Sequence, residues 1–150
     1  FDASAFVKLL VDEDGSDLAA ALWDVCDTAV SSRLAYPEVR AALAAAGRDH
    51  RLDADAQREA EAAWEGYWAA TRPVELTDAV TVHAGRLAGE LALRGADAVH
   101  LASALAVGAD ELLFAAWDQG LRSGARMVGI QVVPAADQGE EAVAERPEAT

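Results

Sequence analysis

The spacing of hydrophobic residues divides the chain into helical stretches separated by short apolar runs. Within each helical stretch, apolar residues recur three and four positions apart, which is typical of a helix that buries one face. This pattern predicts helices over 4–11, 16–27, 35–46, 52–72, 77–94, 96–108 and 118–124. The apolar runs predict strands over 28–32, 73–76, 111–117 and 127–133, and Phe1–Asp2 is expected to end a further strand.

The predicted strands alternate with helices, and this order favours a mainly parallel sheet between two layers of helices. The predicted fold class is therefore α/β, a three-layer α/β/α domain with a central parallel sheet. A chain of 150 residues suits one such domain with a sizeable core. We assign the domain to residues 1–134, because residues 135–150 are acidic and have no hydrophobic period. This last segment is predicted to be a disordered tail.

The composition restricts the function. The formal net charge is −14 at pH 7, whereas proteins that bind polyanions broadly carry a basic surface. Any contact with phosphate therefore depends on individual arginines or on a bound cation. The single cysteine excludes an internal disulfide, and no apolar run reaches the length of a membrane span. Without a signal segment at its start, the chain is expected to be cytoplasmic.

Four acidic residues stand apart from the exposed acidic clusters because their sequence surroundings are apolar. Asp2 follows the first strand, Glu38 lies one turn into the helix after the second, Asp97 opens a helix, and Asp118 ends an apolar strand. Ligand sites in parallel sheets lie at the carboxyl ends of strands, so these acids are expected at one edge of the sheet. Taken singly, each acid is better explained as a helix cap or, for Glu38, as a first-turn acid.

The set of four acids indicates more than capping. Four carboxylates at one edge of a sheet repel one another unless a cation joins them. Carboxylate oxygens without cysteine or paired histidine suit Mg²⁺ or Mn²⁺. Such ions activate water for attack on a phosphodiester and stabilise the leaving oxygen. A bound cation also allows an acidic protein to hold an RNA phosphate.

Four segments of the sequence resemble the signature segments of PIN-domain ribonucleases, and most closely those of the VapC toxins of bacterial toxin–antitoxin pairs. The segments are DASAF, YPEVRAAL with Glu38, DAVHLASAL, and WDQGL after an apolar strand. Their order and spacing agree over roughly residues 1–134. The resemblance implies a metal-dependent endoribonuclease with Mg²⁺ (or Mn²⁺) as cofactor. It carries over Asp2, Glu38, Asp97 and Asp118 as the catalytic and metal-binding acids. It also implies an RNA substrate, a homodimer and inhibition by a VapB-like antitoxin.

Two further residues are candidates for supporting roles. Ser4 stands two residues after Asp2 at a helix start, where orienting Asp2 or a metal-bound water and capping the helix are equally compatible. His100 lies one turn after Asp97 on the same helical face. A lone histidine on an apolar helix is more often a core residue than a base, so we expect His100 to be dispensable for catalysis.

Departures from the family pattern leave alternatives open. Ala116 stands where many relatives have Thr or Ser, and Arg33 where many have an acid. An aspartate-nucleophile phosphatase is a weaker alternative, because that chemistry usually needs D-x-D and Ser4 takes the place of the second acid. A catalytically weak or inactive PIN-like scaffold that acts by protein binding is the other alternative.

Overall fold

The structure is a computed structural model that describes residues 1–108, 110 and 112–135, so most of the predicted acidic tail lies outside the described residues. Seven helices and four short strands occur in this part of the chain. In chain order they are α1 (Ala3–Leu10), α2 (Ser16–Val25), β1 (Val30–Ser32), α3 (Ala35–Arg48), α4 (Ala54–Ala70), β2 (Arg72–Val74), α5 (Asp78–Glu90), α6 (Gly95–Val107), β3 (Leu113–Ala115), α7 (Gln119–Met127) and β4 (Gln131–Val133). None of the helices in the described ranges is both long and apolar enough to cross a membrane.

The strands form two parallel pairs that the first residues of the chain join. β1 pairs with β2 and β3 pairs with β4, both parallel, as the alternation of strands and helices predicts. The amino group of Phe1 donates to the carbonyl of Val30 at 2.9 Å. The N–H of Asp2 donates to the carbonyl of Ala115 at 3.0 Å. Phe1 and Asp2 therefore lie between β1 and β3, and the order across the molecule is β2, β1, residues 1–2, β3, β4.

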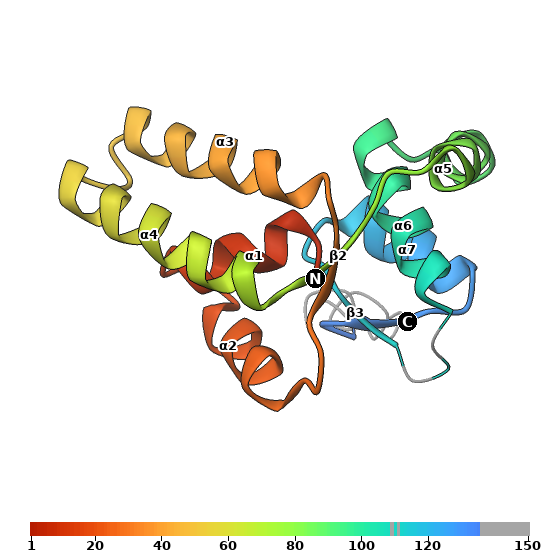
Figure 1. The fold of residues 1–150 in the computed structure, drawn as a ribbon, viewed down its shortest axis with the longest axis horizontal. Coiled ribbons are helices and arrows are strands. Elements are labelled where there is room, and N and C mark those ends of the chain that lie inside the picture. Colours follow the sequence, from red (N-terminus) through yellow and green to blue (C-terminus); the bar gives the residue numbers. More distant parts are fainter. Residues whose placement is uncertain (109, 111, 136–150) are drawn as a thin grey trace, which may run out of the picture.

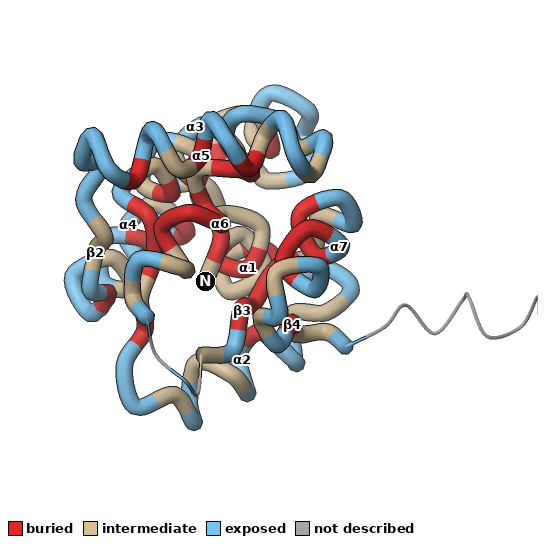
Figure 2. The backbone as a smooth tube through the Cα atoms, turned by 90° about the vertical axis from the view of Figure 1, so that its right-hand side faces the viewer, coloured by how far each residue is buried: buried red, intermediate tan, exposed pale blue. Residues whose placement is uncertain are grey.

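Helices lie on both sides of these strands, which confirms the predicted α/β class. Figure 1 shows α1 to α4 on one side and α5 to α7 on the other. In Figure 2, buried stretches of α6, β3 and α7 gather in the interior, while exposed residues run along the outer surfaces of α3 and α5. The strand ends, and the helix starts that follow them, therefore lie between two helical layers.

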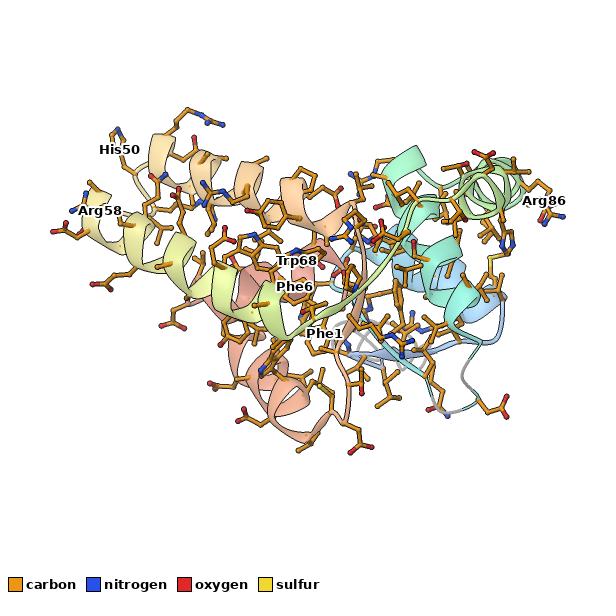
Figure 3. The ribbon with its side chains drawn as sticks, in the orientation of Figure 1. Phe1, Phe6, His50, Arg58, Trp68 and Arg86 are labelled. Atoms are coloured by element: carbon orange, nitrogen blue, oxygen red, sulfur yellow. The ribbon has the colours of Figure 1, made fainter. Side chains whose placement is uncertain are left out.

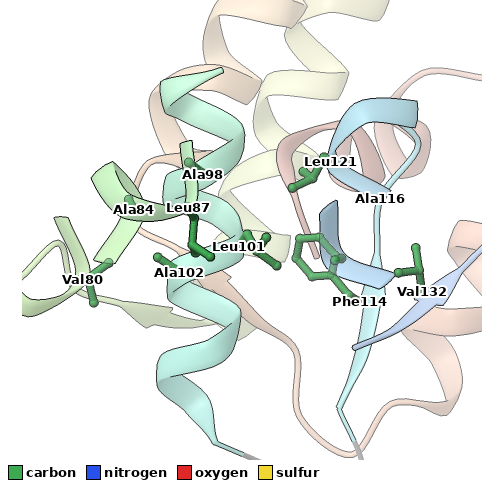
Figure 4. Packing of buried hydrophobic residues seen from close by; sticks show 11 residues of the cluster. Val80, Ala84, Leu87, Ala98, Leu101, Ala102, Phe114, Ala116, Leu121 and Val132 are labelled. Carbon is green, nitrogen blue, oxygen red and sulfur yellow. The ribbon is translucent and has the colours of Figure 1, made fainter. Parts of the chain in front are cut away.

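Each helical layer has its own apolar cluster. On the α5 to α7 side, the cluster contains residues of α5, α6, β3, α7 and β4. Its larger members include Leu87, Leu101, Phe114, Leu121 and Val132 (Figure 4). All five are at least nine-tenths buried. Complete burial of such a side chain contributes about 1.5–3 kcal/mol. This cluster fixes α6 and α7, which carry two of the predicted acids, against β3 and β4.

The cluster on the other side is aromatic. Trp64 of α4 is completely buried, and its ring lies 5.0 Å from that of Phe6 and 5.8 Å from that of Tyr36, centroid to centroid. Figure 3 shows Phe6 and Trp68 among α1, α3 and α4. Tilted and edge-on aromatic pairs of this kind add about 0.5–1.5 kcal/mol each beyond the area that they bury. The cluster holds α1, which begins just after Asp2, against α3, which carries Glu38.

The two largest differences from the predicted boundaries have their cause in the backbone. The helix expected to run to Arg94 ends at Glu90, because Ala92 adopts a left-handed φ of 51°. Gly95 begins α6, one residue before the predicted start of that helix. The strand expected over 127–133 is only β4, since α7 continues to Met127 and Gly129, with φ of 82°, turns the chain before the strand.

Candidate active site

Asp2 is a buried carboxylate held by hydrogen bonds at the start of α1. It is the N-cap of that helix and only 4% exposed. Its Oδ1 accepts from the N–H of Ala5 at 2.8 Å and lies 2.7 Å from the hydroxyl of Ser4. Burial raises the pKa of the Asp2 carboxyl, and the hydrogen bonds from Ser4 and Ala5 oppose this rise. The ionised form of Asp2 therefore gains from any cation brought near it.

Asp97 and Asp118 share one positively charged partner, Arg94. Asp97 lies in the first turn of α6, and Asp118 caps α7 by accepting from the N–H of Leu121 at 2.9 Å. The Nε of Arg94 donates to Oδ2 of Asp97 at 2.7 Å, and its Nη2 donates to Oδ2 of Asp118, also at 2.7 Å. The hydrogen bond to Asp97 is the main reason that the pKa of Arg94 is raised above its usual value. Carboxylates from two helices thus face one cationic group.

Glu38 is paired with His100 across the two helical layers. Glu38 lies in the first turn of α3, and its Oε2 is 2.5 Å from Nε2 of His100 on α6. His100 is buried, as expected of a histidine on an apolar helix, but it has a carboxylate partner that the sequence did not indicate. A charge on His100 lowers the pKa of Asp2, so the histidine lies within electrostatic reach of both acids.

Ser4 connects the start of the chain to the loop before α7. Its hydroxyl oxygen accepts from the N–H of Trp117 at 2.9 Å, next to Asp118, while its hydroxyl group lies against Asp2. Ser4 belongs to α1 and Asp2 is the cap of that helix, so the capping role considered for Ser4 belongs to Asp2. The serine thereby fixes the position of the Asp2 carboxylate relative to the strand end that carries Asp118.

Of the four predicted acids, Asp97 and Asp118 share a contacting partner, whereas Asp2 and Glu38 have separate hydrogen-bond partners. Arg94 joins Asp97 to Asp118, and His100 contacts Glu38 and influences Asp2. Within residues 1–108, 110 and 112–135, no group of three or more His, Cys, Asp or Glu side chains is arranged to hold a metal ion. The donor chemistry nevertheless fits a divalent cation, because all four acids offer oxygen and two of them already surround a positive group. The group that stands between Asp97 and Asp118 in this structure is Arg94.

The two residues that depart from the family pattern have structural contacts. Ala116 is completely buried in the α5 to α7 cluster, and its N–H donates to the carbonyl of Val133 at 3.1 Å. Arg33 forms an exposed ion pair with Glu75. Within the described part of the chain, neither side chain forms a hydrogen bond or an ion pair with any of the four acids.

Arg94 is the site residue that sequence reasoning missed. The spacing Arg94–Gly95–Ala96–Asp97 places an arginine three residues before an acid, which brings the two side chains together if both lie on one helix start. The predicted helices over 77–94 and 96–108 put Arg94 at the end of one helix and Asp97 in the next, which separates the two residues. A helix boundary placed before Arg94 would have predicted its pairing with Asp97.

A cavity of about 500 Å³ lies beside the site without including the acids. Its wall contains Phe1, Ser31, His100, Ser103 and Phe114, and none of the four acids lines it. The four acids therefore lie outside this cavity, and His100 both lines the cavity and contacts Glu38.

Comparisons with known proteins place the chain in a family. The model of the PIN domain family matches residues 1–124. Ribonuclease VapC45 of Mycobacterium tuberculosis (strain CDC 1551 / Oshkosh) is 66% identical over 135 residues, which is 90% of this chain and 94% of that protein. Ribonuclease VapC49 of Mycobacterium tuberculosis (strain ATCC 25618 / H37Rv) matches with the same identity and coverage. Together with the parallel strands and the two helical layers, these matches show that the chain belongs to the PIN domain family, among the VapC ribonucleases.

Proposed function

We propose that the protein is a metal-dependent endoribonuclease, the toxin of a toxin–antitoxin pair, which hydrolyses RNA phosphodiester bonds at Asp2, Glu38, Asp97 and Asp118. The observation that carries the proposal is the shared partner of Asp97 and Asp118, because two carboxylates from separate helices meet at one positive group. The names of the two curated relatives support RNA as the substrate. The cofactor is Mg²⁺ or Mn²⁺, since the donors are carboxylate oxygens.

In this proposal the acids have separate tasks. Asp2, Asp97 and Asp118 would hold the cation, and Glu38 would complete the site directly or through a water molecule. When bound, the cation would supply Lewis-acid activation of a water molecule and charge stabilisation of the leaving oxygen. Ser4 keeps the Asp2 carboxylate oriented through their hydrogen bond. His100 holds Glu38 by the contact at Nε2, so its role is to position that acid.

The proposal also accounts for how an acidic protein binds a polyanion. A net charge of −14 repels RNA at long range. Attraction at the site then depends on the bound cation and on individual arginines. We place the protein in the cytoplasm, as a homodimer whose activity is blocked by a VapB-like antitoxin. Support for these partners comes from membership of the VapC group.

A catalytically weak scaffold that acts by protein binding is the second candidate. It is favoured by Ala116, whose methyl group is buried in the apolar cluster at a position where many relatives have a hydroxyl. The two candidates differ in whether purified protein turns over RNA.

Cleavage of total RNA by purified, antitoxin-free protein tests the proposal. We expect cleavage with added Mg²⁺ or Mn²⁺ and none in EDTA. Asp2→Asn keeps the shape of the side chain but removes a charged ligand, so it should abolish cleavage and leave antitoxin binding largely intact. Asp53→Asn is the matched control, because Asp53 is also a helix N-cap, at the exposed start of α4.

The results separate the candidates cleanly. Cleavage that persists in EDTA or in Asp2→Asn means that the four-acid mechanism is wrong. Absence of cleavage with every metal, in a folded protein that still binds its antitoxin, favours the scaffold. Activity of Asp53→Asn equal to that of the wild type assigns the loss in Asp2→Asn to the site.

A further inference from the structure

Arg94 engages the same carboxylate oxygens that a divalent cation would use. Its Nε lies 2.7 Å from Oδ2 of Asp97, and its Nη2 lies 3.3 Å from Oδ1 of Asp97 and 2.7 Å from Oδ2 of Asp118. One guanidinium therefore spans both acids, in a geometry that a forked, planar cation makes well. A metal ion and this guanidinium cannot occupy the space between the two carboxylates together.

The Arg94 side chain is mostly exposed to solvent. Its exposed fraction is 73%, whereas that of the Asp97 side chain is 13%. The backbone of Arg94 lies just outside α6, in an extended conformation as its N-cap. Ion pairs of exposed arginines are weak because water and salt screen them. A small divalent cation with two charges can therefore displace the guanidinium while Asp97 and Asp118 stay in place.

We propose that Arg94 is an intramolecular competitor of the divalent cation, which holds Asp97 and Asp118 together without metal and must leave them before metal binds. The inference rests on the proposed metal site and adds a residue that regulates its occupancy. The inference also accounts for two observations. Among the described residues, no three acidic, histidine or cysteine side chains are arranged to hold a metal ion, and the Arg94 guanidinium stands between Asp97 and Asp118.

The opposite role makes the opposite prediction. If Arg94 served only to position the acids, its removal would let them separate and would weaken metal binding. If Arg94 competes, its removal frees the oxygens and strengthens binding. The sign of the change in metal affinity therefore distinguishes a competitor from a structural partner. Measuring this affinity does not require RNA cleavage.

Calorimetric titration of the purified full chain with Mn²⁺ tests the inference. We expect Arg94→Gln to bind Mn²⁺ several-fold to about tenfold more tightly than the wild type, the range set by two screened ion pairs. Arg94→Lys keeps the charge but loses the fork, so its affinity should lie between the two. The difference in Mn²⁺ affinity between Arg94→Gln and the wild type should decrease as the KCl concentration is raised, because salt weakens the ion pairs of Arg94.

Arg33→Gln is the matched control. Arg33 follows β1 and pairs with Glu75, so this change removes one positive charge from the strand-end region without touching Asp97 or Asp118. It should leave the Mn²⁺ affinity close to that of the wild type. A second readout follows the ¹⁵Nε–Hε signal of Arg94, identified by its loss in Arg94→Gln. Saturation with diamagnetic Mg²⁺ should shift this signal and leave that of Arg33 in place.

The outcomes distinguish competition by Arg94 from a general charge effect and from the absence of a metal site. Equal Mn²⁺ affinity in wild type and Arg94→Gln, or weaker binding in Arg94→Gln, overturns the competition and leaves the metal site standing. An equal gain in Arg33→Gln also overturns it, because general charge would then explain the effect. No Mn²⁺ binding in any variant overturns both this inference and the metal site of the proposed function.

Discussion

At the residue scale, the Glu38–His100 pair shows why a contact alone does not assign a catalytic role. The 2.5 Å contact gives His100 a partner, and its charge also influences Asp2. A histidine that moves protons in the reaction contributes roughly 10²–10⁴-fold to the rate. A histidine that only positions an acid contributes much less when that acid stays in contact with water, as the partly exposed Glu38 does.

His100→Ala should therefore lower kcat/KM for RNA by no more than about tenfold, well below the loss expected for a proton-transfer group. Steady-state cleavage of a short fluorescent RNA measures this change. His83→Ala on α5, a helix that carries none of the four acids, is the control for loss of an imidazole. A fall of a hundredfold or more in His100→Ala alone would make the histidine a participant in the chemistry.

At the element scale, the start of α6 organises the site. Asp97 and His100 are three residues apart on α6, so they project from neighbouring turns of the helix, and Arg94 is the N-cap just before it. Through them α6 contacts Asp118 at the start of α7 and Glu38 in α3. One helix start thus links acids that are far apart in the sequence.

How far the sequence predicts these elements depends on what sets each boundary. The apolar spacing located α6 and the acid at its start, because burial against the sheet sets that period. The predicted helix over 77–94 ends too late, because the break lies at Ala92, whose left-handed conformation alanine rarely adopts and no residue pattern signals. The contacts of Arg94 with Asp118 and of His100 with Glu38 depend on how α6 packs against α7 and α3, which the sequence alone does not define.

The turn before α2 offers a test of packing beside the site. Gly15 has a φ of 91°, and a Cβ there would lie 2.5 Å from Nε1 of Trp117, the residue before Asp118. We expect Gly15→Ala to lower the free energy of unfolding by about 1–3 kcal/mol, because the left-handed backbone and the close ring both oppose a side chain. Urea denaturation measures the difference.

Gly66→Ala is the control for this substitution. Gly66 lies within α4, and nothing stands within 4 Å of a Cβ at that position. Alanine there should raise the free energy of unfolding by about 0.5–1 kcal/mol. Equal effects of the two substitutions would show that the Gly15 turn does not constrain the Trp117 segment.

At the scale of the whole molecule, the proposed metal site would link stability to metal binding. Folding places Asp2 between β1 and β3 and brings Asp97 and Asp118 to the Arg94 side chain, whereas the unfolded chain has no such arrangement. A ligand that binds only the folded state stabilises it, by about 2.7 kcal/mol at a concentration one hundred times its Kd. The net charge of −14 adds to this effect, because a bound cation also relieves repulsion.

Mn²⁺ at saturating concentration should therefore raise the melting temperature by about 5–10 °C for a chain of this size. Differential scanning calorimetry with and without Mn²⁺ measures the shift. Asp97→Asn should remove most of it, while Asp53→Asn, which alters an exposed helix cap on α4, should retain it. Equal shifts in wild type and Asp97→Asn would locate the bound metal elsewhere.

The central claim is that acids from separate elements converge to hold one divalent cation. Anomalous diffraction from crystals of the protein grown with Mn²⁺ tests this most directly, because the metal is located by its own scattering. We predict an anomalous peak bound by Asp97 and Asp118, with Asp2 at the same site and the Arg94 guanidinium moved away. Crystals in saturating Mn²⁺ with no peak between Asp97 and Asp118, and with Arg94 still bridging them, would contradict the account.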